Sequence, residues 1–178
     1  IYPDTSLEDF LTRNKIDFIF SKNVNSDKNI LDRISDHTLA FSISAAWIFK
    51  TGFIDLFNGR LLNLHGTKLP QDRGGGGFSW RILRNDRIGF SLIHKVDPGL
   101  DTGDIIACEE YFYPSSCRLP IDFMDYSAQK YLTFLEKFID DVRQEKEFKV
   151  VSQQEYLSSY WPRISTEVHG YINWSWSL

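Results

Sequence analysis

The residues of this chain that could do chemistry stand at the end of an apolar run and in a later glycine-rich turn. The run 61–65 ends in Asn63, Leu64 and His65, and Asp101 follows 36 positions after the histidine, within the turn 98–103. An amide donates to a developing oxyanion without titrating, and an imidazole moves protons near neutral pH. A nearby carboxylate raises the pKa of the imidazole and fixes its tautomer. Together these groups suit acyl transfer to an amine.

The local pattern around these residues predicts how they are positioned. Alternation over 61–65 predicts a buried strand, with Asn63 and His65 on one face and Leu64 toward the core. Glycines and a proline between 66 and 77 end this strand and begin a loop. Polar groups at the carboxyl end of a strand lie where open α/β sheets build their sites. In the turn, Gly99 and Gly103 free the backbone to wrap closely around a ligand.

The remaining elements predict an α/β fold. Strands are predicted at 16–20, 39–44, 61–65, 88–96 and 104–113. Helices are predicted at 7–11 with Ser6 as N-cap, in part of 25–34, within 45–57, at 78–83 and at 121–142. Strands that alternate with helices favour a mostly parallel central sheet, followed by a hairpin-like or mixed pair over 88–113.

Composition narrows the class of protein. A length of 178 residues favours one domain, and we expect a catalytic domain over 1–150 and an aromatic-rich C-terminal extension over 151–178. The net charge of −4 and the absence of long basic runs count against a nucleic-acid partner. No apolar run reaches about 18 residues, so we expect no membrane span. Cys108 and Cys117 are expected to be unpaired cytosolic thiols, and no metal site is expected.

Each signal also has a plainer interpretation. An Asn-x-His pair at a strand end is more often a local hydrogen-bonding pair, and an Asp in a glycine-rich turn is commonly structural. The glycines 74–77 alone indicate a loop, because the lysine and serine of a phosphate-binding loop are missing. His37 and His94 lie outside the motif and are interpreted as structural. The combination and order of the signals therefore carry the argument.

In combination, these residues resemble the N10-formyltetrahydrofolate-dependent formyltransferases. That superfamily includes methionyl-tRNA formyltransferase, glycinamide ribonucleotide transformylase and the sugar-nucleotide N-formyltransferases. The resemblance covers about 39–106 and is carried by Asn63-Leu-His65, Gly66-Thr-Lys-Leu-Pro70, Arg73-Gly74 and Gly99-Leu-Asp-Thr-Gly-Asp104. It implies a Rossmann-like catalytic domain in which Asn63, His65 and Asp101 are catalytic, with N10-formyltetrahydrofolate as the donor.

The same resemblance implies a set of folate-binding residues, and the residue types near the motif and after residue 150 suggest a set for the acceptor. Folate is expected to lie against Ser44, Ala45, Ala46, Trp47, Ile48, Phe49, Val96, Asp97, Gly99 and Leu100. The acceptor is expected near Thr67, Arg73, Gly75, Gly76, Trp80, Tyr160, Trp161 and Arg163. One or two aromatic rings would stack on a nucleobase, and Arg163 would pair with a diphosphate. Alternatively, Trp80 is a helix core residue and the late aromatic residues cover a sheet edge.

The chain departs from the family in two places. The family begins with a strand–helix–strand unit that has no counterpart here, so we expect an N-terminally truncated or abbreviated domain. Arg73-Gly-Gly-Gly-Gly-Phe-Ser-Trp80 replaces the usual Arg-Gly-Ala-Ala-Pro, and this version looks most like the sugar-nucleotide branch. The segments 160–163 and 169–174 resemble that branch as well.

We therefore expect formyl transfer to the primary amine of a nucleotide-linked amino sugar. Small-molecule partners, a cytoplasmic location and a role in lipopolysaccharide (O-antigen) biosynthesis go with this expectation, and a homodimer is left open. The alternatives within the superfamily are a methionyl-tRNA formyltransferase, a glycinamide ribonucleotide formyltransferase and a formyl-folate hydrolase. A non-catalytic folate- or nucleotide-binding remnant is the alternative from another class.

Overall fold

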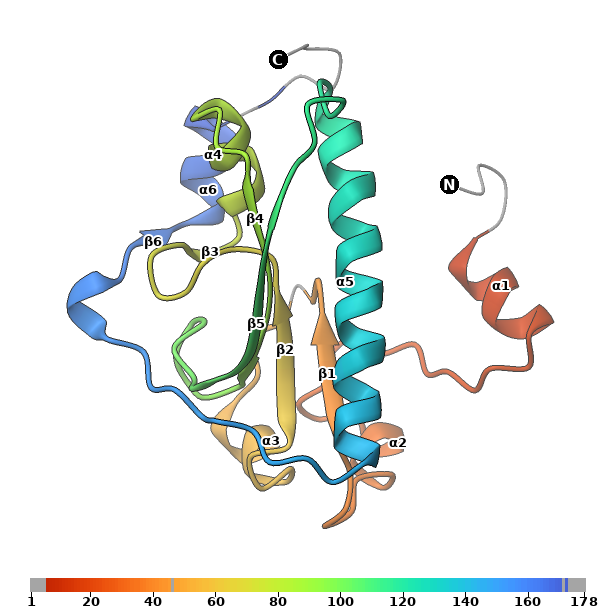
Figure 1. Ribbon diagram of the computed structural model, residues 1–178. Helices are drawn as coiled ribbons and strands as arrows, with labels where there is room; N and C mark the ends of the chain where they lie inside the picture. Colours follow the sequence, from red (N-terminus) through yellow and green to blue (C-terminus); the bar gives the residue numbers. More distant parts are fainter. Residues whose placement is uncertain (1–5, 46, 171, 173–178) are drawn as a thin grey trace.

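A mixed four-stranded sheet forms the centre of the molecule. The computed structural model describes residues 6–45, 47–170 and 172, without the side chain of Arg163. The sheet order is β1 (Ala40–Ile43), β2 (Leu61–His65), β4 (Ile88–Lys95) and β5 (Ile105–Phe112). The β1 and β2 strands are parallel, and β4 is antiparallel to both β2 and β5. Three of the four strands therefore run in one direction (Figure 1), as expected for the predicted α/β fold.

Six α-helices, one 3-10 helix and a small second sheet complete the part of the chain that is described. The helices are α1 (Leu7–Arg13), α2 (Lys28–Leu31), α3 (Thr51–Asp55), α4 (Gly77–Leu83), α5 (Pro120–Arg143) and α6 (Arg163–His169), with the 3-10 helix at Glu155–Leu157. The second sheet pairs β3 (Arg73–Gly74) in parallel with β6 (Tyr160–Trp161). Ser6 caps α1 as predicted, because its hydroxyl accepts from the Asp9 N–H.

One local prediction was wrong. Residues 16–20 form no strand, although their composition is apolar, and Ile16 and Phe20 are exposed. A strand needs a neighbouring strand to form the hydrogen bonds of its backbone N–H and C=O groups, and no described segment pairs with residues 16–20. The helix predicted in part of 25–34 is confirmed as the four-residue α2. The α1 helix buries none of its residues and stands away from the sheet (Figure 1).

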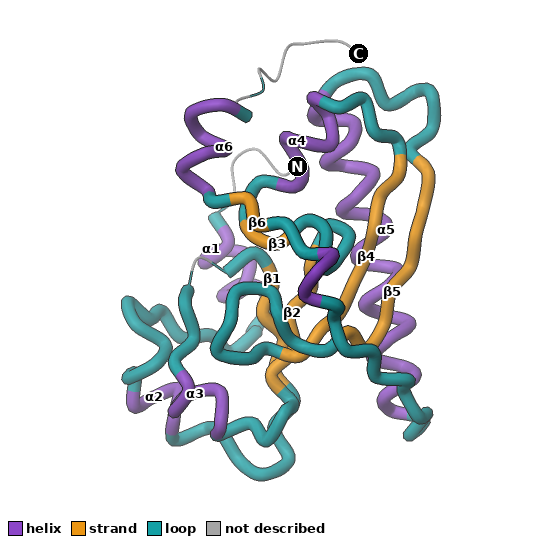
Figure 2. Tube along the Cα trace, turned by 90° about the vertical axis from the view of Figure 1, so that its left-hand side faces the viewer, coloured by secondary structure: helices purple, strands orange, loops and turns teal. Residues whose placement is uncertain are grey.

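Alternation along β2 divides the core between two faces of the sheet. Leu62 packs with Ile93, Phe134 and Phe138, and the last two come from α5. Leu61 points the other way and packs with Phe53 of α3. The long α5 lies along β4 and β5 (Figure 2). This packing fixes the strand whose end carries Asn63 and His65.

A connecting segment ties the end of the chain back to the sheet. After α5 it runs along the sheet toward β6 (Figure 1), and Val151 forms an antiparallel bridge with Ile105. Cys108 and Cys117 are free thiols, as expected. Within the residues that are described, no helix is both long and apolar enough to cross a membrane.

The contact between α5 and the sheet can be tested by truncating one aromatic side chain. Phe138 is 3% exposed, so Phe138→Ala should lower the free energy of unfolding by about 3–5 kcal/mol through lost burial and a cavity. Leu132→Ala is the matched control because Leu132 lies on the same helix and is 62% exposed. Urea unfolding of both variants measures the difference. Equal effects would contradict the packing described here.

Candidate active site

The end of β2 places two polar side chains beside the neighbouring strand. Asn63 and His65 share one face of β2, as alternation predicts, and Asn63 lies opposite His94 in the β2–β4 register. The β4–β5 pairing shifts register between Ile93 and His94. The extra residue of this irregularity is Ile106 on β5, so the register of β4 with β2 is unbroken. The β2–β4 pairing therefore brings His94 to the same site as the β2 residues.

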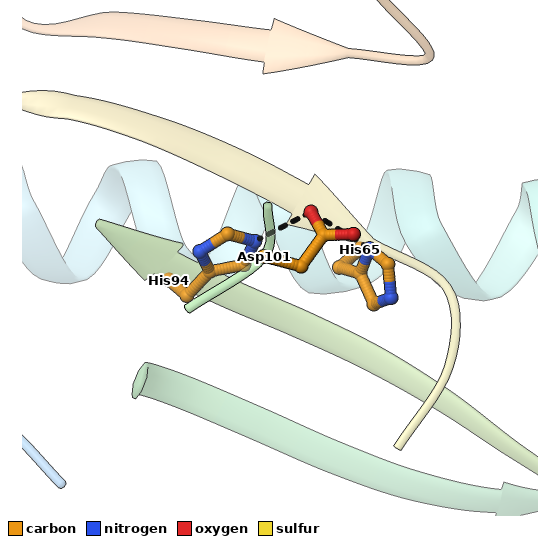
Figure 3. A group of neighbouring side chains, drawn as sticks. All are labelled: His65, His94 and Asp101. Atoms are coloured by element: carbon orange, nitrogen blue, oxygen red, sulfur yellow. Dashed lines mark ion pairs between the residues drawn. The ribbon is translucent and has the colours of Figure 1, made fainter. Parts of the chain in front are cut away.

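The turn between β4 and β5 brings the carboxylate of Asp101 to this face. Asp101 has a φ of 54°, the left-handed region that only a few residue types adopt readily. Its Oδ2 accepts a hydrogen bond of 2.8 Å from the Gly74 N–H. Its Oδ1 lies 3.7 Å from His65 Nδ1 and 3.6 Å from His94 Nε2. Figure 3 shows the carboxylate between the two rings.

Gly74 is required for this arrangement. Its φ is 94°, and an added Cβ would lie 2.5 Å from the Trp161 carbonyl oxygen. A side chain at this position would therefore push β3 away from β6 and move the N–H that holds Asp101. The backbone donor that orients the carboxylate depends on a residue without a Cβ.

Hydrogen bonds on the far side of His65 define its tautomer. The Thr67 hydroxyl lies 2.6 Å from both His65 Nε2 and the Asp72 carbonyl oxygen. Because a carbonyl only accepts, the Thr67 hydroxyl donates to Asp72 and His65 Nε2–H donates to Thr67. The neutral ring therefore carries its lone pair on Nδ1, the nitrogen that faces Asp101.

His94 and Asn63 form a second oriented pair. His94 Nδ1 donates to the Lys95 carbonyl oxygen at 2.7 Å, which leaves the Nε2 of the neutral ring as an acceptor. The Asn63 amide nitrogen lies 3.1 Å from this Nε2. One amide hydrogen of Asn63 is thus used to fix the orientation of the amide, and the second remains for another acceptor.

The burial of these groups sets their charges. Burial lowers the pKa of His65, and this effect outweighs the opposite influence of Asp101 and of the Asp72 carbonyl. Burial also raises the pKa of Asp101, but His94, His65 and the Gly74 N–H lower it more, to about 2. At neutral pH the site therefore holds a neutral His65 imidazole beside an ionised carboxylate.

The same three side chains are the group in the described chain that could hold a metal ion. Potential ligand atoms of His65, His94 and Asp101 all lie within 4.8 Å of one another. In the neutral ring, however, the lone pair on His94 Nε2 already accepts from the Asn63 amide. An ion would have to break this hydrogen bond, so the arrangement favours proton chemistry.

A cleft of about 890 Å³ opens beside these groups. Asn63, His65 and Asp101 all line it, so the structure brings the three predicted catalytic residues together. Nine of the ten predicted folate-binding residues line the same cleft; Ala46 lies outside the described residues. Of the predicted acceptor residues, Thr67, Gly75 and Tyr160 line it.

Other predicted acceptor residues do not line the cleft. Arg73 is buried and its guanidinium binds Gln153 and Glu155, which leaves it turned away from a ligand. Trp80 donates to Thr166 and its ring lies 5.0 Å from that of Trp161. The two tryptophan rings pack α4 against the β6–α6 segment. This contact agrees with the alternative prediction that Trp80 is a core residue of its helix.

Trp161 and Gly76 likewise have packing contacts. The Trp161 ring nitrogen donates to the Asp72 carboxylate at 3.0 Å. A Cβ on Gly76 would collide with Thr166. Arg163 begins α6, and its side chain lies outside what the structure describes.

His94 is the site residue that sequence reasoning missed. It was interpreted as a structural strand residue, yet it lies between Asn63 and Asp101. Its position depends on the pairing of β4 with β2, which a local pattern does not reveal. The usable signal was its place on a predicted strand that leads directly into the Asp101 turn.

The amino-acid sequence is similar to those of known formyl transferases. A profile of the formyl transferase family matches residues 6–112. The methionyl-tRNA formyltransferase of Finegoldia magna is 32% identical over 97 residues, which are 53% of this chain and 31% of that protein. That of Prochlorococcus marinus is 21% identical over 187 residues, 94% of this chain and 57% of that protein. The chain thus spans about a third to just over half of these relatives.

Solved structures show the same fold. The sugar 3N-formyltransferase WlaRD, determined with dTDP and 5-N-formyl-THF, superimposes with a TM-score of 0.71 at 25% identity, over 94% of this chain and 57% of that one. PseJ from Anoxybacillus kamchatkensis was determined in complex with UDP-4,6-dideoxy-4-formamido-L-AltNAc and tetrahydrofolate. Its TM-score is 0.73 at 23% identity, over 96% of this chain and 89% of that one. An N-formyltransferase from Helicobacter canadensis, in complex with folinic acid and dTDP-3-aminofucose, has a TM-score of 0.70 at 23% identity, over 94% of this chain and 58% of that one.

The ionised Asp101 predicts a specific acid response of stability. Because its pKa is about 2 in the folded chain, its contribution to folding is present above pH 4 and lost as the pH falls toward 2. Relative to an ordinary Asp, this contribution is about 2 kcal/mol. The lowered pKa of His65 acts in the same sense, since protonation below its ordinary range favours the unfolded chain.

Chemical unfolding of Asp101→Asn between pH 5 and pH 2 tests this response. The variant should lose less stability than the wild type as the pH falls through this range, since it has no carboxylate to protonate. Asp125→Asn, an exposed site on α5, should keep the wild-type slope. Identical pH slopes for wild type and Asp101→Asn would contradict the assignment.

Proposed function

We propose that this chain, which belongs to the formyl transferase family, transfers a formyl group from N10-formyltetrahydrofolate to the primary amine of a nucleotide-linked amino sugar. The observation that carries the proposal is the Asp101 carboxylate within 4 Å of both His65 and His94, on the wall of a cleft that Asn63 also lines. The chain places an oriented amide donor, a neutral imidazole and a fixed anion at one point. Acyl transfer to an amine needs these three groups.

The cleft suits a folate donor in size and lining. Its volume lies near the upper end of the usual range for small-molecule sites, about 300–1,000 Å³. Residues 43–45 and 47–49 line it from the end of β1, and 96–101 line it from the β4–β5 turn. Trp47, Ile48 and Leu100 supply apolar surface for a pterin ring. The structures of PseJ with tetrahydrofolate and of WlaRD with 5-N-formyl-THF support the same donor class.

Asn63 provides the oxyanion donor in this reaction. The unprotonated amine of the acceptor attacks the formyl carbon, and the carbonyl oxygen becomes negatively charged. The second hydrogen of the Asn63 amide is available for this oxygen, because the first is held by His94. The oriented amide stabilises the tetrahedral intermediate more than the planar formyl group, which lowers the barrier.

His65 and Asp101 transfer the proton that the attacking amine loses. The amine nitrogen becomes positively charged when its bond to the formyl carbon forms, and it must lose a proton. The unprotonated His65 Nδ1 is placed to accept this proton, and the Asp101 carboxylate at 3.7 Å stabilises the resulting imidazolium. The proton is then delivered to N10 as the bond between the formyl carbon and N10 breaks, and tetrahydrofolate leaves. No step requires a metal ion.

A nucleotide-linked sugar is the acceptor that the surface favours. The chain carries 20 Lys and Arg against 24 Asp and Glu, which disfavours an extended polyanion such as tRNA. Tyr160, Thr166 and Glu167 line the cleft from the β6–α6 segment, and the half-exposed Tyr160 ring offers a surface on which a base can stack. The nucleotide-sugar complexes of PseJ and of the Helicobacter canadensis enzyme support this class.

The second candidate is formylation of methionyl-tRNA. The observation in its favour is that the curated relatives reported above are methionyl-tRNA formyltransferases. An acceptor panel with N10-formyltetrahydrofolate separates the candidates: a nucleotide-linked amino sugar, charged initiator tRNA, glycinamide ribonucleotide, or water alone. We expect formamido-sugar product, detected by mass spectrometry. Product with tRNA alone, or formate without an acceptor, would replace the proposal.

Side-chain truncation tests the assigned roles. Asn63→Ala should lower kcat about 10²–10³-fold, because one oxyanion donor is removed, with little change in folate affinity. His65→Ala should lower kcat about 10²–10⁴-fold through loss of the proton acceptor. His37→Ala is the control, since His37 is exposed and distant from the motif. Wild-type turnover in His65→Ala would remove His65 from the mechanism.

A further inference from the structure

Gln153 connects the C-terminal segment to the turn that carries Asp101. Its side-chain Nε2 donates to the Asp101 carbonyl oxygen at 2.9 Å and to the Gly103 carbonyl oxygen at 2.7 Å. Its Oε1 accepts from Arg73 Nε at 3.2 Å and from Arg73 Nη2 at 3.1 Å. Both hydrogens and the oxygen of this amide are thus engaged. A side chain satisfied in this way has one orientation.

Gln153, Arg73 and Gly74 form a continuous set of contacts that begins and ends at Asp101. Gln153 binds the backbone of Asp101 and the guanidinium of Arg73. Gly74, the next residue after Arg73, donates its N–H to the Asp101 carboxylate at 2.8 Å. Arg73 is itself 5% exposed, and its N–H is bonded to the Ser159 carbonyl. Asp101 is therefore held at its main chain by Gln153 and at its side chain by Gly74.

The hydrogen bonds from Gln153 and Gly74 constrain a residue with an unfavourable backbone conformation. Asp101 has a φ of 54°, a left-handed conformation that a non-glycine residue keeps only where its surroundings impose it. Residues 98–100 of the turn are exposed, whereas Thr102 is half-buried and Gly103 is buried. Asp97 accepts from the Gly99 N–H and the Thr102 hydroxyl, but neither bond reaches the backbone of Asp101. Gln153 supplies two hydrogen bonds to carbonyls on either side of Thr102.

We propose that Gln153 is a positioning residue for formyl transfer, which fixes the Asp101 turn and so aims the carboxylate between His65 and His94. This inference rests on the proposed function for its effect on rate, although the geometry is independent of the acceptor. It also gives the C-terminal segment a role in the site, because Gln153 lies 52 positions after the acid that it orients.

Gln153→Glu is the most informative variant because it keeps the hydrogen bonds from Arg73 and removes those to the carbonyls of Asp101 and Gly103. A glutamate still accepts from Arg73, but it has no N–H for the carbonyls of Asp101 and Gly103 and places an anion against them. Gln154→Glu is the matched control, since the neighbouring Gln154 is exposed and makes no cap contact. Gln153→Leu, which removes both halves, is the second variant.

The kinetic readout is the rate of formyl transfer at saturating acceptor. We expect Gln153→Glu to lower kcat about 10²-fold, the usual effect of displacing a catalytic group by about 1 Å, with little change in the acceptor KM. Gln154→Glu should retain the wild-type kcat. An unchanged kcat in Gln153→Glu would overturn the proposal.

A spectroscopic readout separates this inference from the proposed function. In ¹H–¹³C NMR spectra, the ring signals of His65 and His94 report the adjacent Asp101 carboxylate, and the exposed His37 serves as a reference. In Gln153→Glu and Gln153→Leu these two signals should shift toward their positions in Asp101→Ala. A lowered Tm with unmoved ring signals would show a merely structural role and overturn the proposal. If the wild type formylates no acceptor, the proposed function fails while this comparison still decides the role of Gln153.

Discussion

The site depends on keeping one carboxylate ionised and fixed between two imidazoles. Asp101 lies in a turn and has a left-handed backbone conformation; its carboxylate accepts from the Gly74 N–H and lies within 4 Å of the rings of His65 and His94. The β2–β4 pairing brings the two histidines to one face, and the β3–β6 pairing positions the backbone donor.

The arrangement also explains why each neutral group points as it does. Thr67 and Asp72 hold the proton of His65 on the ring nitrogen away from the acid, so the other nitrogen faces the carboxylate unprotonated. His94 orients the Asn63 amide, which leaves one amide hydrogen for substrate. Preorganisation of this kind stabilises charge that develops in a transition state without reorganising the protein.

Much of the site could be predicted from the sequence because its signals are local. A five-residue apolar run with period two places Asn63 and His65 on one face, and a glycine-rich turn places Asp101 at a strand end. The register between β2 and β4, which brings His94 beside Asn63, is a property of pairing between distant segments. Gln153 carries no local signal at all, since its role arises from contacts with Arg73 and with the Asp101 turn.

The wrong prediction of a strand at 16–20 has the same origin. Residues 16–20 have a strand-like composition, but no described segment pairs with them, and composition cannot supply a partner. Trp80 and Trp161 were predicted to lie near the acceptor from their residue type, and in the structure their rings pack together between α4 and β6. Aromatic residues serve packing and stacking equally well, so the choice between these roles needs the three-dimensional arrangement.

A single-turnover measurement with Asp101→Asn tests the central claim most directly. The asparagine keeps the shape of the side chain and removes its charge, so folate should still bind while the rate of formyl transfer to a nucleotide-linked amino sugar falls about 10²-fold or more. A transfer rate equal to that of the wild type, in a folded variant that binds folate, would contradict the account.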